Sequence, residues 1–200
     1  PTFTKDLINS RIEQGLRTFT GAYIITNQGL KLPKSEVVVD HFLAPIWENK
    51  EALAQIAQTT QSLQALHEAM GAYRGWGGGG FMSYEVVTDL NYTPVLSSAK
   101  DRYRWANAGP GAIRGLNRIL GKPLKKGMTQ AVANDFMRKL LSTAPFYTMP
   151  HVPLDQVDMR TIEHSLCEWD KYERVRLGQG RPRSVYKPDL FNEVPQGAVE

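Results

Sequence analysis

The sequence predicts an all-α fold with long loops, because apolar side chains recur every three to four residues along most of the chain. Clusters of glycine and proline separate these periodic stretches and mark the connections between helices. Hydrophobic residues make up 42% of the 200 residues, which is enough for one globular domain with an ordinary core. We therefore expect a single helical domain over residues 1–186, with a loop-rich junction at 71–80 and a tail at 187–200.

Three helices are expected before residue 71. Helical spacing of apolar residues marks residues 7–16 and 35–47, with Ser35 as a candidate N-cap. The clearest amphipathic pattern runs over residues 49–70, where an asparagine again offers a cap. Residues 21–29 fit either a short strand that ends in a turn or an extended loop.

The stretch at 71–80, GAYRGWGGGG, interrupts this helical pattern. Four consecutive glycines disfavour a helix, since each costs about 1 kcal/mol relative to alanine. The run fits a flexible linker. Its neighbours Tyr73, Arg74 and Trp76 favour instead a loop that packs on a flat surface, and a nucleobase is such a surface. Tyr73 and Trp76 are therefore candidate base-stacking residues.

The second half predicts four more helices. They cover residues 81–90, 112–120 and 129–141, followed by a helix that Asp158 caps and that runs to about residue 174. The segment at 145–153 is punctuated by proline and reads as an extended connection, and the chain from Gly178 onward reads as coil.

Cysteine content and hydropathy bear on the compartment. Cys167 is the single cysteine, so the chain has no intramolecular disulfide framework and suits a reducing compartment. No apolar run approaches the roughly 18–20 residues of a membrane span, and no secretory leader is recognisable. We expect a soluble intracellular protein without a membrane partner.

Positive charge is concentrated in the second half of the chain. Residues 100–187 carry 17 Lys and Arg side chains against 8 Asp and Glu, whereas residues 1–99 carry 7 against 9. Such an excess can bind a polyanion or can simply keep exposed helices soluble. Because the excess coincides with a glycine turn, it favours a surface that binds a polyanion.

That turn, Gly109-Pro110-Gly111, opens a helix that carries Arg114 and Arg118 one turn apart, with Asn117 beside them. Glycines let backbone N–H groups approach an anion, and a helix N-terminus adds free N–H groups and a positive dipole end. The two arginines add donors suited to phosphate. The stretch predicts a phosphate-binding hairpin, although the same residues also fit ordinary helix punctuation with a solvated face.

A basic and aromatic segment near the C-terminus is a second candidate for contacts with nucleic acid. Arginines alternate there with tyrosines, a pattern suited to phosphate and stacking contacts. The candidate phosphate ligands of this segment are Arg174, Arg181 and Arg183.

Two groups of side chains suggest catalysis. His164, Cys167, Glu168 and Lys171 fall on one stripe of the last expected helix. Glu168 or His164 fits a general base, and Lys171 fits a group that neutralises a leaving anion, although a solvated Glu–Lys face has the same pattern.

Glu85 and Asp89, one turn apart, form the second group, which fits binding of an amine or cation, proton transfer, or pairing with arginines. With one cysteine and no second His/Cys cluster, we expect no metal site and no cofactor. A P-loop is absent, so the chain by itself is not a P-loop kinase.

Several segments together resemble the bacteriophage thymidine-hypermodification proteins, the amino acid:DNA transferases also called α-glutamyl/putrescinyl-thymine pyrophosphorylases. The helical domain of 5-hydroxymethyluracil DNA kinases is similar. The resemblance covers residues 19–186 and is carried by residues 19–23, 79–90, 109–118, 162–172 and 180–183.

The resemblance implies a fold related to the helix-hairpin-helix DNA glycosylases, with Gly109-Pro110-Gly111 as the phosphate-binding hairpin. Glycosylases of this type also carry a catalytic aspartate about two dozen residues later, in an extended segment. This chain offers only Asp135, inside an expected helix, so the pattern disfavours base excision.

The implied reaction replaces the pyrophosphate of pyrophosphorylated 5-hydroxymethyluracil in double-stranded DNA by an amino acid or polyamine nitrogen. Arg114, Arg118 and Lys171 would then meet the departing pyrophosphate. One of Glu85, Asp89 and Glu168 would orient and deprotonate the ammonium, and Tyr73 or Trp76 would stack on the extruded base. The alternative is a non-catalytic DNA-binding domain that assists a hydroxymethyluracil DNA kinase or a transferase. Either role would place the protein in the cytoplasm of an infected bacterium.

Overall fold

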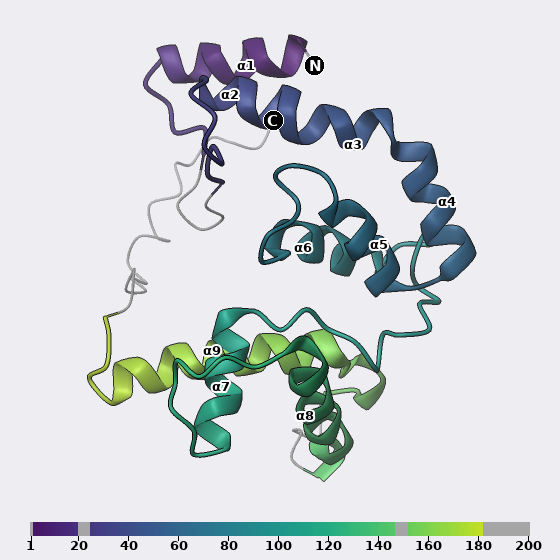
Figure 1. Ribbon diagram of the computed structural model, residues 1–200, viewed down its shortest axis with the longest axis vertical. Coiled ribbons are helices and arrows are strands. Elements are labelled where there is room, and N and C mark those ends of the chain that lie inside the picture. The colour runs from purple at the N-terminus through teal and green to yellow at the C-terminus, as the bar shows by residue number, and fades with distance from the viewer. Residues whose placement is uncertain (1, 20–24, 147–151, 182–200) are drawn as a thin grey trace, which may run out of the picture.

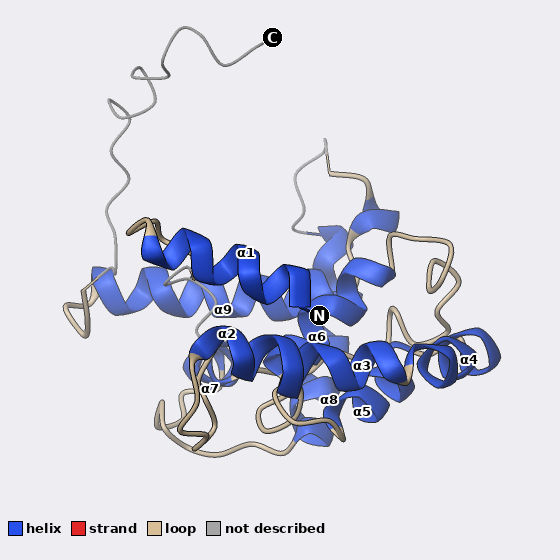
Figure 2. Ribbon diagram, turned by 90° about the horizontal axis from the view of Figure 1, so that it is seen from above, coloured by secondary structure: helices blue, strands red, loops and turns tan. Residues whose placement is uncertain are grey.

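The computed structural model describes residues 2–19, 25–146 and 152–181, and all regular secondary structure in these ranges is helical (Figures 1 and 2). The all-α prediction is therefore confirmed. Of the segment with two alternatives, residues 25–29 are loop and turn, and the remainder lies outside the described residues. The predicted tail at 187–200 also lies outside them.

Residues 34–48 of the first half form an unbroken run of short helical segments, and further helices precede and follow it. Their bounds are α1 Thr2–Glu13, α2 Lys34–Glu36, a π-helical segment Val37–Leu43, α3 Ala44–Glu48, α4 Lys50–Thr60 and α5 Leu63–Gly71. In Figure 1 α1 to α4 run over the top and one side of α5 and its neighbour α6 (Phe81–Leu90). The helix predicted at 81–90 thus has the predicted bounds.

The second half packs three helices together. They are α7 Pro110–Ile119, α8 Gln130–Thr143 and α9 Met159–Arg176, with short 3-10 turns at Ala144–Phe146 and Leu154–Gln156. Thr129 caps α8 and Asp158 caps α9, as their sequence positions suggest. In Figure 1 α7 crosses α9, and α8 lies beside them.

Two sequence expectations about helix ends are wrong. Ser35 is not a cap: it is buried, its hydroxyl donates to Asn9 Oδ1 at 2.6 Å, and Pro33 holds the N-cap position. The helix expected over 49–70 breaks at Gln61, which adopts a left-handed conformation with φ 45°. Ser62 is the N-cap of α5, and the Asp101 carboxylate also accepts hydrogen bonds from the backbone N–H groups of Leu63 and Gln64 at 2.8 and 3.0 Å.

The glycine-rich loop is a packed element. Trp76 is buried in the core formed by α4, α5 and α6, and its Nε1 donates to the carbonyl of Phe42 at 2.8 Å. Tyr73 is half-buried against the same core. Gly77 passes so close to the carbonyl of Gly71 that a Cβ would clash with it. The loop is therefore packed rather than a flexible linker, and the Trp76 indole is enclosed by the core, so its stacking on a base stays a prediction.

Tyr84 joins the two halves. It lies on α6 but is buried in the core of α7, α8 and α9, where its ring contacts Trp105 edge to face with centroids 5.6 Å apart. Trp105 in turn packs against both cores. This contact places α6 next to the N-terminal half of α9.

Helices α7 and α9 approach closely because glycines face α9. A Cβ on Gly111 would overlap the Cys167 sulfur, and one on Gly115 would lie 2.6 Å from the carbonyl oxygen of Leu166. The contact at Gly115 is with backbone, so a side-chain rotation cannot relieve it, and the contact at Gly111 is with the Cys167 side chain. Gly111 is therefore a packing residue, which is a different role from the phosphate contact expected of it.

We expect Gly115→Ala to destabilise the protein by about 2 kcal/mol, because the new methyl group forces the two helices apart. Gly127→Ala is the matched control, since a Cβ there meets nothing within 4 Å. Urea unfolding of both variants followed by circular dichroism measures the difference. Equal stability of the two variants would contradict the close packing of α7 on α9.

Candidate functional site

A fully buried aspartate joins α9 to α7. Asp170 is 0% exposed. The Nε atoms of Arg114 and Arg118 donate to its two carboxylate oxygens at 2.7 and 2.9 Å. Arg174, one turn further along α9, places its Nε 3.4 Å from Oδ2. One carboxylate therefore holds three guanidinium groups at the interface of the two helices.

Arg114 and Arg118 thus contact an anion of the protein itself, and their contact with phosphate stays a prediction. The Arg118 side chain is only 9% exposed and also donates to Gln179 Oε1 at 2.9 Å. Burial alone would raise the pKa of Asp170, but the hydrogen bonds from Arg114 and Arg118 outweigh burial and hold that pKa below its usual value. Both arginines thus stabilise a buried anion of the protein.

The glycine turn also binds a carboxylate of the chain itself. Gly109 is the N-cap of α7, and its N–H donates to Glu163 Oε1 at 3.3 Å. Asn117 is fully buried, and its Nδ2 donates to the carbonyls of Leu124 and Lys126 at 3.3 and 2.9 Å. Gly109 therefore faces Glu163, and Asn117 fixes the loop after α7, while their contacts with phosphate stay predictions.

The predicted polar stripe of α9 is present and faces solvent. His164, Glu168 and Lys171 are each more than half exposed. His164 Nε2 lies 3.6 Å from Glu168 Oε1, and Lys171 donates to the same oxygen. Cys167 instead faces Gly111, and burial raises the pKa of its thiol, which disfavours a nucleophilic thiolate. The three exposed side chains pair mainly with one another.

A second charged cluster links α6 to α9 and was not predicted as a unit. Arg160 lies on α9 with Nη1 3.1 Å from Glu85 Oε1 and 3.5 Å from Glu163 Oε2. Its guanidinium also covers the ring of Tyr84 at 5.1 Å. Asp89, the expected partner of Glu85, is exposed on α6. Glu85 thus joins a cluster that Arg160 organises.

Glu163 is the most unusual group of this cluster. Only 7% of the residue is exposed. Burial raises its pKa above the usual value, and the N–H of Gly109 and the charge of Arg160 compensate only in part. A buried carboxyl with a raised pKa beside an arginine is typical of general acid–base sites.

The sequence does carry a signal for Glu163. The buried residues of α9 are Met159, Glu163, Leu166 and Asp170, so two carboxylates interrupt the face that packs on the core. Helical spacing alone identifies that face. The exposed stripe is the weaker signal, because charged side chains are common on exposed helix faces and the free-energy cost of placing them there is low.

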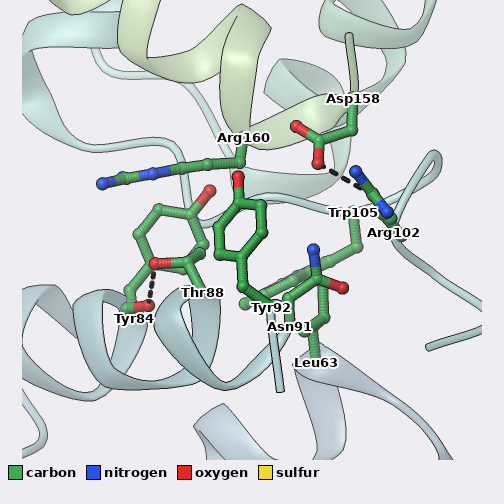
Figure 3. Close-up of a pocket in the computed structure, with 9 residues that line it drawn as sticks. All are labelled: Leu63, Tyr84, Thr88, Asn91, Tyr92, Arg102, Trp105, Asp158 and Arg160. Atoms are coloured by element: carbon green, nitrogen blue, oxygen red, sulfur yellow. Dashed lines mark hydrogen bonds and ion pairs between the residues drawn. The ribbon is translucent and has the colours of Figure 1, made fainter. Parts of the chain in front are cut away.

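A narrow pocket adjoins this cluster (Figure 3). Tyr84, Tyr92 and Trp105 supply aromatic walls, and Asp158 and Arg102 form an ion pair with Nε 3.0 Å from Oδ2. Its cavity volume is about 10 Å³, which is space for about one water molecule. A nucleobase needs far more room, so a base enters only if side chains move.

Of the three candidate phosphate ligands near the C-terminus, the structure describes Arg174 and Arg181. Arg174 is partly exposed beside Asp170, and Arg181 is exposed at the end of the described residues. Arg183 lies outside them.

Among the residues that the structure describes, no group of three or more His, Cys, Asp or Glu side chains is arranged to hold a metal ion. No helix in the described ranges is long and apolar enough to cross a membrane.

One family model matches the chain. It is described as the helical domain of 5-hmdU DNA kinase, and it covers residues 2–181. No curated protein and no solved structure matches.

We expect Asp170→Asn to cost about 3 kcal/mol of stability, because it leaves buried arginines without their anion. Asp135→Asn is the control: Asp135 pairs with Arg138 and Lys139 but is about half exposed, so it should cost under about 1 kcal/mol. Chemical unfolding of both variants at neutral pH makes the comparison.

The same variant should change acid stability. The pKa of Asp170 is lower in the folded protein than in the unfolded chain, where it is about 4. Its contribution to the free energy of unfolding is therefore fully present above about pH 4 and is lost as the pH falls through the pKa of the folded state. The unfolding free energy of the wild type should therefore drop more steeply below about pH 4 than that of Asp170→Asn. Parallel pH profiles would show that Asp170 is not the titrating group.

Proposed function

Since the chain belongs to the family of the helical domain of 5-hmdU DNA kinase, we propose that it acts in the hypermodification of thymine in DNA. Its substrate on this proposal is double-stranded DNA that carries 5-hydroxymethyluracil or a phosphorylated form of that base. The concentration of positive charge in residues 100–187 supports a polyanionic substrate.

The reaction we propose replaces pyrophosphate on the modified base by an amine. The amine nitrogen forms a bond to the methylene carbon at C5, the bond from that carbon to the pyrophosphate oxygen breaks, and pyrophosphate leaves. The ammonium of the incoming amine must first lose a proton. Glu163 is the proposed base, because it is a buried carboxyl with a raised pKa next to Arg160.

Arg160 is the proposed positioning residue of this site. It holds Glu85 and Glu163 together and covers the ring of Tyr84, so it fixes the orientation of Glu163, the proposed general base. Lys171 and His164 lie on the exposed side of the same helix, where they are proposed to meet the departing pyrophosphate. Glu168, which already pairs with both, is proposed to orient them.

The DNA backbone would meet the exposed basic side chains rather than the buried ones. Arg174, Arg181 and Arg183 remain proposed phosphate contacts. We add Lys125 and Lys126, which are exposed on the loop that Asn117 fixes after α7.

A non-catalytic role in assisting a hydroxymethyluracil DNA kinase or transferase is the second candidate. The observation that favours it is the size of the pocket beside the charged cluster, which is about 10 Å³. In that case the domain would bind and present the modified DNA, and a separate enzyme would carry out the chemistry.

The test mixes the protein with DNA that contains pyrophosphorylated 5-hydroxymethyluracil and a pool of amino acids and polyamines. Mass spectrometry of the digested nucleosides then reports transfer. We expect a new nucleoside from the wild type and a loss of about 100-fold or more in rate for Glu163→Gln, because a general base contributes that much. Tight, salt-dependent binding to unchanged DNA would support the non-catalytic role.

Glu168→Gln on the same helix distinguishes the two carboxylates: we expect a smaller loss of rate than for Glu163→Gln, because Glu168 orients His164 and Lys171 but does not accept the proton. If Glu168→Gln abolished transfer and Glu163→Gln did not, the exposed stripe would supply the base. The wild-type rate should also fall as the pH drops through the raised pKa of Glu163, because only the carboxylate accepts a proton.

A further inference from the structure

The side chain of Asn91 is almost fully buried, yet it has no hydrogen-bond partner among the described residues. Asn91 follows α6 and is 5% exposed. Figure 3 shows its amide nitrogen directed into the pocket that Tyr92 and Arg102 also line. A buried amide without partners is costly, so its free N–H groups point to a ligand that carries a hydrogen-bond acceptor.

Further donors surround the same pocket. Arg102 Nε donates to Asp158, whereas the Nη groups of Arg102 have no partner within the described part of the chain. The start of α9 holds Arg102 in place, since the N–H of Met159 donates to the Arg102 carbonyl at 3.3 Å. Tyr92 adds a hydroxyl group. Donors that are held in place before a ligand arrives favour an acceptor, because little ordering entropy is lost on binding.

The charges favour a neutral acceptor over an ion. Among the described residues that line the pocket, Arg102 and Arg160 face one carboxylate, Asp158, and this balance disfavours a cation. Arg160 is also paired with Glu85 and Glu163 outside the lining, so its charge is already balanced and an anion gains little. A carbonyl oxygen accepts hydrogen bonds without carrying a full charge.

The size of the pocket admits one atom of such a ligand. A volume of about 10 Å³ holds one group the size of a water molecule. Tyr92 lines the pocket and is 71% exposed, so its ring offers a free aromatic face beside it. A pyrimidine base has both parts that this arrangement requires, because it carries a carbonyl oxygen on its edge and a flat face that stacks on an aromatic ring.

We propose that this pocket takes a carbonyl oxygen of the extruded uracil ring, with Asn91 Nδ2 as the donor and Tyr92 stacked on the base. The inference rests on the proposed function, in which the DNA carries 5-hydroxymethyluracil. Only the oxygen enters the pocket, which is too small for the ring. Arg160 lines the pocket and pairs with Glu163, so a base held there lies next to the proposed general base.

The experiment measures binding of the full chain to two DNA duplexes by fluorescence anisotropy. One duplex carries 5-hydroxymethyluracil opposite guanine, a mispair that lowers the cost of extruding the base. The other carries an abasic analogue at the same position, so the backbone phosphates are the same in both. We expect the wild type to bind the first duplex about tenfold more tightly or better, because only that duplex supplies the carbonyl oxygen and the stacking face.

Two substitutions test the two contacts. Asn91→Asp replaces the amide donor by an acceptor of the same shape, and it should weaken binding to the base-containing duplex about tenfold or more. Tyr92→Ala removes the aromatic face and should weaken that binding about fivefold or more. Binding to the abasic duplex should stay as in the wild type, because neither contact is made there.

Two controls separate recognition of the base from charge and folding. Asn49→Asp makes the same change of charge at an exposed site outside the pocket, and it should bind both duplexes as the wild type does. Melting temperatures report whether each variant is folded. Because Tyr92 is exposed, Tyr92→Ala keeps the test decisive even if Asn91→Asp does not fold.

The outcomes separate this inference from the proposed function. Equal binding of the wild type to both duplexes would overturn the inference and leave DNA binding in place. Full affinity of Asn91→Asp for the base would also overturn it, and so would an equal loss for both duplexes, which would assign the pocket to a backbone phosphate. If the base is recognised through Asn91 but no nucleoside is ever modified, the pocket stands and the transferase proposal fails.

Discussion

Asp170 is a buried carboxylate at the crossing of two helices, and the second half of the molecule depends on how it is neutralised. Arg114 and Arg118 reach it from α7, and Arg174 reaches it from the next turn of α9. Gly115 brings the helix backbones close enough for these contacts. Removal of one partner from a buried ion pair is far more destabilising than loss of a surface pair, so the geometry of α7 on α9 is tightly constrained.

Glu163 is a second carboxylate on the buried face of α9, and it is the proposed general base. Glu163 occupies the N-terminus of α7 through the N–H of Gly109, where an external anion was expected. Arg160 connects it to Glu85 on α6, and Tyr84 fixes α6 in the core below. Helices that are distant in the sequence thereby converge on one buried carboxyl with a raised pKa.

The family match covers every helix of the structure. The matched residues, 2–181, include α6, α7 and α9, which together build the charged cluster and the pocket. DNA is a polyanion, yet the arginines of α7 are directed inward. On the proposed function, the contacts with DNA therefore fall to exposed basic residues, and the interior charges serve to position the reacting groups.

The sequence by itself determined the helical class, the helix at 81–90 and the cap Asp158, because these follow from local spacing and from hydrogen bonds within one turn. It also identified the polar stripe of α9. Tertiary structure decided what the charged residues do. The Asp101 carboxylate accepts a hydrogen bond from Leu63 at the start of α5, 38 residues earlier in the chain. Asp170 pairs with both arginines of α7, and the Trp76 indole donates to a carbonyl of the π-helical segment. Local sequence periodicity cannot specify such pairs, because each joins residues that become neighbours only when the helices pack.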